Sequence, residues 1–159
     1  MRNIFIFEKK VVILPLNNNT TWVNMNIKKQ KLCLEYPLAT KSPNIVWEQI
    51  STIHGLERWL ADHIEETGEN ILSLTWGEVW TDHHTLEARI IECQKNDHIR
   101  LQWLNEDDPE AYWEMRIGRS ELTDELCLYV ADYALPEDID DLHDLWDGNM
   151  ERLHQASGL

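Results

Sequence analysis

The chain has 159 residues, of which 43% are hydrophobic and 27% charged, and its formal net charge is −15. This length and composition predict one globular domain and exclude bulk disorder. The acidic excess repels phosphate backbones and anionic bilayers, so we expect neither nucleic-acid binding nor membrane insertion. A protein partner with a basic surface stays open beside the simpler interpretation that the charge provides solubility.

The first 24 residues differ from the remainder of the chain. Their apolar start is interrupted by the run EKK at residues 8–10, which leaves no stretch long enough to span a bilayer and no clear signal-peptide core. Pro15 and the asparagines at 17–19 then break any regular element. We expect residues 1–24 to form an appendage outside the fold and residues 25–159 to form the domain. A weak export signal and an added edge strand are the alternatives.

The domain begins with an expected strand and two expected short helices. Residues 29–37 alternate apolar and polar side chains, which predicts a half-buried strand. Ser42 and Pro43 are typical of a helix N-cap and a first helical residue, and apolar residues at helical spacing follow them. Gly55 is expected to end this helix, and residues 56–62 are expected to form a second one.

A run of antiparallel strands is predicted next, because apolar residues occupy every second position in successive segments. Polar turn compositions separate the segments, as expected for a meander. The predicted strands are 71–80, 85–92, 98–104, 111–117 and 125–133.

The stretch TWGEVWTDHH, residues 75–84, is interpreted as the end of a strand and its turn. Paired residues must lie on the same face of the sheet. The predicted pairs are Trp76 with Ile90 and Trp80 with Leu86. This register makes Glu78 a polar exception on the inner face and places the histidines at 83–84 at an exposed tip.

The last segment, residues 135–155, has apolar residues at three- and four-residue steps, which predicts a long amphipathic helix with an acidic outer face. Acidic residues crowd its first turn, where the helix dipole favours carboxylates. Gly148 interrupts the pattern and is expected to permit close packing onto the sheet. A strand, two short helices, an antiparallel meander and a long terminal helix define an α+β fold.

Motifs that would carry chemistry are sparse. The three widely spaced cysteines lack a CxxC pair, which favours reduced, buried thiols in a cytoplasmic protein. The histidines lack metal-ligand spacing, and the adjacent carboxylate pairs fall in turns or on solvent faces. No phosphate-binding or nucleophile-elbow motif occurs. We therefore expect no metal and no cofactor, and the question of enzyme activity stays open with no catalytic residue assigned.

The run SPNIVWEQISTIHGLERWLAD resembles the opening helices of START-like proteins related to the activators of the Hsp90 ATPase. The matching positions are Ser42, Pro43, Val46, Trp47, Ile50, Ser51, Gly55, Leu56, Trp59 and Leu60. Residues 101–103 and the Leu145-Trp146 pair fit the same pattern. The resemblance covers about residues 28–156 and is closest to small START-like proteins of the Bacteroidetes type.

The resemblance implies a helix-grip fold, in which a curved antiparallel sheet wraps around a long C-terminal helix, as in the birch-pollen allergen. It also implies three functions. The first is non-enzymatic binding of a small hydrophobic or aromatic, lipid-like ligand in a cavity between sheet and helix. The alternatives are a chaperone-regulating interaction protein and a polyketide cyclase-like enzyme. The matching residues are mostly apolar and transfer no catalytic role.

The inward-facing side chains are interpreted as the lining of a ligand cavity or, alternatively, as a filled core. Most are tryptophans and methionines, with Glu78 as the polar group that would orient a ligand. The candidate set is Trp76, Glu78, Trp80, Ile90, Trp103, Trp113, Met115, Trp146 and Met150. The oligomeric state stays open.

Overall fold

A computed structural model of the protein describes residues 28–78 and 80–159, so the predicted appendage at 1–24 lies outside the described residues. Within them the strands are β1 (Gln30–Pro37), β2 (His63–Gly68), β3 (Ile71–Trp76), β4 (His84–Gln94), β5 (His98–Trp103), β6 (Trp113–Arg119) and β7 (Leu126–Ala134). The helices are α1 (Pro43–Ser51), α2 (Ile53–Glu57) and α3 (Ile139–Ser157), and a 3-10 turn, η1 (Pro136–Asp138), precedes α3.

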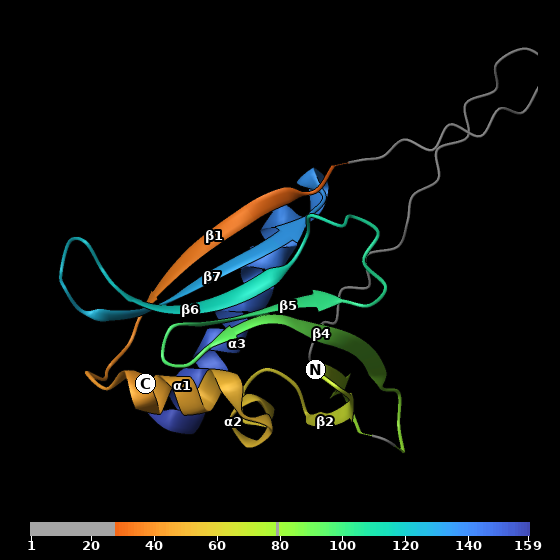
Figure 1. Ribbon diagram of the computed structural model, residues 1–159, viewed down its shortest axis with the longest axis horizontal. Coiled ribbons are helices and arrows are strands. Elements are labelled where there is room, and N and C mark those ends of the chain that lie inside the picture. The colour runs from red at the N-terminus through yellow and green to blue at the C-terminus, as the bar shows by residue number, and fades with distance from the viewer. Residues whose placement is uncertain (1–27, 79) are drawn as a thin grey trace, which may run out of the picture.

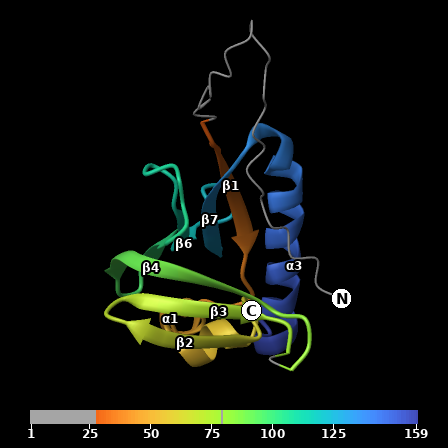
Figure 2. The ribbon, with the colours of Figure 1, turned by 90° about the vertical axis from the view of Figure 1, so that its right-hand side faces the viewer.

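The described strands form one antiparallel sheet in the order β1-β7-β6-β5-β4-β3-β2. The chain thus returns from β7 to pair with its first strand. Figure 1 and Figure 2 show that the sheet bends: β1 and β7 run alongside α3, whereas β2, β3 and β4 cross near its C-terminal end with α1 and α2. This arrangement confirms the predicted α+β fold with a curved sheet around a long terminal helix.

The core lies between α3, the two short helices and the face of the sheet turned toward them, which we call the inner face. Alternation places the inner side chains of β7 there, and Leu126, Leu128 and Val130 are all buried. Trp59 is fully buried, and its indole N–H donates a hydrogen bond of 3.0 Å to the carbonyl of Gln49. The polar tip of this large side chain therefore keeps a partner inside the core.

The helix α3 confirms the amphipathic helix that the three- and four-residue spacing of apolar residues predicts. Its buried face consists of Leu142, Trp146, Asn149, Met150 and Leu153. The helix ends at Gly158, whose φ of 73° is left-handed and whose N–H bonds to the carbonyl of His154 at 2.8 Å. No helix in the described part of the chain is long and apolar enough to cross a membrane.

Gly148 does not provide the close packing that we expected of it. Among the described residues, a Cβ atom built at this position meets no heavy atom within 4 Å apart from its chain neighbours and the backbone of α3 itself. We therefore expect Gly148→Ala to raise the free energy of unfolding by about 1 kcal/mol, because alanine restricts the unfolded chain and favours the helix. Urea unfolding of both proteins measures the difference. A loss of stability would show that this face of α3 is covered.

The second short helix begins earlier than predicted, at Ile53 instead of residue 56. The hydroxyl of Thr52 accepts the N–H of Gly55 at 3.0 Å and so caps the start of α2. Gly55 lies within this helix, and a Cβ there would stand 2.1 Å from the carbonyl oxygen of Glu48. Gly55 therefore permits the close approach of α1 and α2 and does not end a helix.

The edge strand β2 was not predicted. Its side chains are mostly exposed, and only Ile64, opposite Leu74 of β3, is buried. An edge strand needs no alternating apolar face to pair with its neighbour, so its sequence is polar.

The turn between β3 and β4 corrects the predicted register. Gly77 has a φ of +88°, and a Cβ there would lie 2.6 Å from the carbonyl oxygen of Asp82, so β3 ends at Trp76. The observed pairs are Leu74 with Leu86 and Trp76 with His84. The predicted pairs of Trp76 with Ile90 and Trp80 with Leu86 are therefore wrong.

The two histidines of this turn have different positions. His83 is exposed, as predicted. His84 is the first residue of β4 and is half-buried, with its ring stacked on Trp76 at 6.2 Å between centroids.

The cysteines also differ from expectation. Cys127 is buried, as predicted, but Cys33 and Cys93 are exposed free thiols. Cys33 lies on the face of β1 that points away from the core, because the apolar residues of β1 occupy the alternate positions.

Candidate functional site

Tryptophan rings form a connected series through the interior. The distances between neighbouring ring centroids are 6.4 Å for Trp76–Trp103, 5.1 Å for Trp103–Trp113, 6.4 Å for Trp113–Trp146 and 6.5 Å for Trp146–Trp59. The contacts join β3, β5, β6 and α3 to the turn that follows α2. Trp76 and Trp103 are half-buried, whereas the other three are buried. The series thus leads from the rim of the core to its centre.

Seven of the nine candidate lining residues take part in one apolar cluster. Trp113, Met115, Trp146 and Met150 belong to the buried core. Trp76, Ile90 and Trp103 are half-buried and pack against it. Their role as the lining of a ligand cavity stays a prediction.

Glu78 and Trp80 do not belong to this cluster. Trp80 is 83% exposed, and its indole N–H donates a 2.7 Å hydrogen bond to the carboxylate of Glu78, which is itself exposed. The expectation that both face the interior is wrong because β3 ends before them, at Trp76, and the alternation of a strand no longer applies.

Asp132 is a polar residue at an inner position of the sheet. It continues the inner positions of β7 after Val130 and lies opposite Leu32 of β1. One of its carboxylate oxygens accepts the indole N–H of Trp146 on α3 at 2.8 Å, and the other accepts the backbone N–H of Tyr133 at 2.7 Å. Asp132 therefore connects the sheet to the helix across the interior.

Asp132 is half-buried, and its pKa is raised to about 7, chiefly because this burial disfavours the charged carboxylate. The hydrogen bonds from Trp146 and Tyr133 and the charge of Lys29 act in the opposite direction, while Glu106 raises the pKa further. The ammonium of Lys29 lies 2.7 Å from both carboxylate oxygens of Glu106, so its charge is already engaged. Partial burial thus favours the protonated carboxyl, and a carboxyl perturbed in this way is a candidate functional group.

Trp113 adds a second unusual polar group beside Asp132. Its side chain is buried, and its indole N–H has no hydrogen-bond acceptor within the described residues. The register pairs Glu114 of β6 with Ala131 of β7, so the next inner positions on these strands are Trp113 and Asp132. A buried donor without an acceptor costs about 1–3 kcal/mol. The carboxyl of Asp132 and the unpaired N–H of Trp113 therefore belong to neighbouring residues on the inner face. Neither of them was predicted from the sequence as a polar group of the site.

The outer face of the sheet carries a different kind of polar cluster. Glu114, 7% exposed, receives hydrogen bonds from Arg100 at 2.8 Å and from Arg116 at 3.2 Å. Burial alone would raise the pKa of Glu114, but these two guanidinium groups outweigh burial and lower it. Arg116 also contacts Asp97 at 2.8 Å. These charges satisfy one another, which indicates a structural network.

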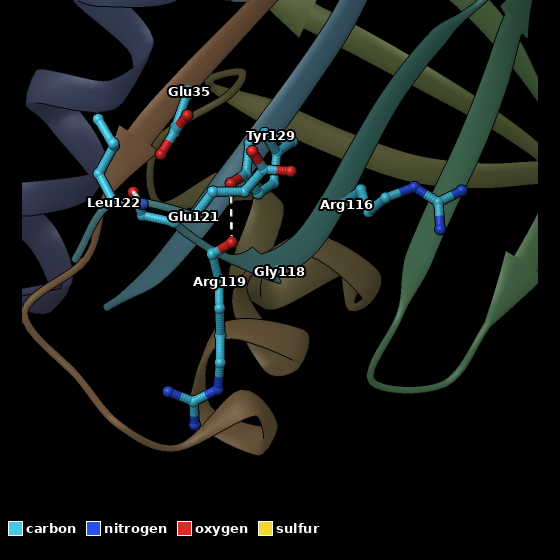
Figure 3. A pocket seen from close by; sticks show the side chains of 8 residues that line it. Glu35, Arg116, Gly118, Arg119, Glu121, Leu122 and Tyr129 are labelled. Atoms are coloured by element: carbon cyan, nitrogen blue, oxygen red, sulfur yellow. Dashed lines mark hydrogen bonds between the residues drawn. The ribbon is translucent and has the colours of Figure 1, made fainter. Parts of the chain in front are cut away.

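A shallow hollow of about 690 Å³ lies beside this network, at the turn between β6 and β7 (Figure 3). Within it the hydroxyl of Tyr129 donates to the carbonyl of Arg119 at 3.0 Å (Figure 3). The Arg119 guanidinium donates to the carbonyl of Asp124 at 2.8 Å. Its residues are Glu35, Arg116, Gly118, Arg119, Ser120, Glu121, Leu122 and Tyr129. Since its guanidinium groups already have partners, the inner cluster is the stronger candidate site.

The described part of α3 brings donor atoms of His143, Asp144 and Asp147 within 4.8 Å of one another. All three side chains are exposed, and Asp147 already accepts the hydroxyl of Tyr36 at 2.7 Å. We assign no metal to this group, because exposed carboxylates on a helix are ordinary solvated charges.

A curved antiparallel sheet that encloses a long terminal helix, with aromatic and carboxyl groups between them, defines a helix-grip protein. A family model described as the START-like superfamily domain matches residues 25–159, so the chain belongs to the START-like superfamily. No curated protein matches the chain.

Solved structures show the same fold. The protein BfR322 from Bacteroides fragilis is 33% identical, with a TM-score of 0.54 over 80% of this chain and 90% of that one. The Aha1 dimer from Colwellia psychrerythraea is 12% identical, with a TM-score of 0.60 over 81% of this chain and 98% of that one. Protein SA2116 from Staphylococcus aureus, whose function is unknown, is 11% identical, with a TM-score of 0.59 over 82% and 96%. At 11–12% identity the similarity shows the fold alone.

Proposed function

We propose that this protein binds a small hydrophobic or aromatic molecule between the inner face of the sheet and α3. The observation that carries the proposal is that Asp132 and Trp113, whose indole N–H lacks an acceptor, occupy neighbouring inner positions of β7 and β6. An unpaired N–H group in a buried core and a half-buried carboxyl at its edge each lower stability, so packing alone does not account for them. A ligand would supply an acceptor for the indole N–H of Trp113 and a further donor for the carboxylate of Asp132.

The indole series supports this function. Burial of apolar ligand surface contributes roughly 25 cal/mol per Å² before the costs of association. Trp76 and Trp103 are half-buried, so the ligand would enter at their end of the series and reach Trp113 beyond them. Because the rings already contact one another, binding must shift side chains or α3, and the intrinsic fluorescence should change with it.

The proposal is tested by native mass spectrometry of gently purified protein, followed by thermal-shift measurements across a panel of lipids and aromatic compounds. We expect a co-purifying molecule or a rise in melting temperature with at least one class. The exposed-site variant Trp80→Ala should behave like the wild type, whereas Trp113→Leu should lose the effect. An empty protein with no shift across the panel would overturn the proposal.

Chaperone regulation and cyclase-like catalysis, which the family resemblance also implies, lack a specific observation that favours them. A chaperone contact through the acidic surface should weaken with ionic strength. A pull-down of an Hsp90 chaperone at low and high salt therefore distinguishes it from ligand binding.

A further inference from the structure

We infer that the ligand of this site is an apolar amine whose ammonium group binds the carboxylate of Asp132 among the indole rings. The inference rests on the proposed function and specifies the chemical class of the ligand. It starts from the contacts of Asp132 and from the charges around it.

The carboxylate of Asp132 has unused acceptor capacity. Two oxygens offer about four acceptor positions, and the hydrogen bonds from Trp146 and from the amide of Tyr133 occupy two of them. Across residues 28–78 and 80–159, no basic side chain forms an ion pair with this carboxylate. A ligand group that is both a hydrogen-bond donor and a cation would occupy a free acceptor position and also pair with the negative charge.

The surroundings do not neutralise the carboxylate. On β1 its partner is the apolar Leu32, and on β6 and α3 its neighbours are the indoles of Trp113 and Trp146. The charged groups that act on it are Lys29, which precedes β1, and Glu106, in the loop after β5, and these two pair with each other. Their charges cancel, so the site retains the net negative charge of one carboxylate.

The rings favour the same class of ligand. Indole faces attract ammonium groups by about 0.5–2 kcal/mol, and most strongly where water is excluded. Trp113 and Trp146 are 2% and 3% exposed, so water is largely excluded there. An oxygen atom on the ligand would in addition accept the unpaired N–H of Trp113.

Proton linkage makes the inference testable, because ammonium binding requires the ionised form of Asp132. The titration of Asp132 near pH 7 lies far below that of an alkylamine, near 10, so only the carboxyl changes charge between pH 5.5 and 8. Affinity for the amine should therefore rise with pH across this range, whereas affinity for a neutral analogue should not.

The experiment compares 4-phenylbutylamine with its neutral analogue 4-phenylbutan-1-ol by isothermal titration calorimetry on the full chain. We expect the amine to bind at least tenfold more tightly than the alcohol at pH 8, and its affinity to fall by about 30-fold at pH 5.5. Asp132→Asn should abolish both effects and leave the alcohol unaffected. Asp144→Asn, which removes the same charge from the exposed face of α3, should change neither.

The outcomes are distinguishable. Equal affinity for the two probes, an amine preference that persists in Asp132→Asn, or an affinity independent of pH in the wild type would each overturn the inference. So would failure of both probes to bind, or a co-purified ligand that lacks an amine. The last result leaves the proposed function intact, whereas an empty protein that no compound of the panel stabilises overturns that function as well.

Discussion

Asp132→Asn is expected to raise the free energy of unfolding at pH 8 by up to about 4 kcal/mol. The wild-type carboxyl has a pKa of about 7 in the folded protein and an ordinary value of 3.8 in the unfolded chain. Each pKa unit corresponds to about 1.36 kcal/mol of stability. Asparagine carries no charge and so avoids the penalty for burying a carboxylate. Its NH2 group cannot accept a hydrogen bond, so one of the bonds from Trp146 and Tyr133 is lost and the gain stays below this upper value.

The pH dependence gives this prediction its sign. Below about pH 4 the wild-type carboxyl is protonated in both states, and the two proteins should be similarly stable. Between about pH 4 and 7 the folded state binds a proton that the unfolded state has released, so the wild type loses stability as pH rises. Above pH 7 the difference should be constant. Urea unfolding at four pH values measures it, and a variant that is less stable than the wild type at pH 8 would contradict it.

Trp59→Ala is expected to lower the free energy of unfolding by about 3–5 kcal/mol. Trp59 is fully buried, contacts Trp146 at 6.5 Å and donates a hydrogen bond to Gln49, so truncation leaves a large cavity and an unpaired carbonyl. Trp80→Ala is the matched control, because the same substitution at an 83% exposed position should change stability by less than about 0.5 kcal/mol.

Thermal and urea unfolding of the two variants measure the contrast. Trp59→Phe, which keeps most of the ring but loses the indole N–H, should fall between the wild type and Trp59→Ala, and it provides a readout if the alanine variant does not fold. A large loss for Trp80→Ala would show that this side chain is covered in the native protein and would contradict its exposed position.

The elements with one buried face were predictable from the sequence. The pattern of β7 and the spacing of Leu142, Trp146, Met150 and Leu153 in α3 follow directly from the need to bury one side. The edge strand β2 escaped prediction because only Ile64 is buried there. The start of α2 was not predicted either. It depends on the side-chain cap from Thr52 and on the contact of Gly55 with α1, which are set by the folded structure.

The candidate site was predictable only in part, for related reasons. Alternation correctly gathers Trp103, Trp113 and Met115, because β5 and β6 continue without interruption through these positions. It fails beyond Gly77, since a positive φ ends the strand and removes the basis for counting. By the same alternation, Asp132 occupies an inner position of β7. It was not predicted, because the predicted lining consisted of apolar residues and Glu78.

The unpaired N–H of Trp113 has no signature in the sequence. Whether an indole finds an acceptor depends on which groups the folded chain brings within about 3 Å, and most buried indoles succeed, as Trp59 and Trp146 do. Such an exception emerges only when the partners of every buried polar atom are known.

The pairing of β1 with β7 also has a consequence for synthesis on the ribosome. The first strand of the sheet receives its partner only when the last strand has been made, and Tyr36 reaches Asp147 across 111 residues. Contacts so distant in sequence form slowly, because a long loop must close first. The nascent chain therefore holds the apolar side of β1 uncovered until β7 has also emerged.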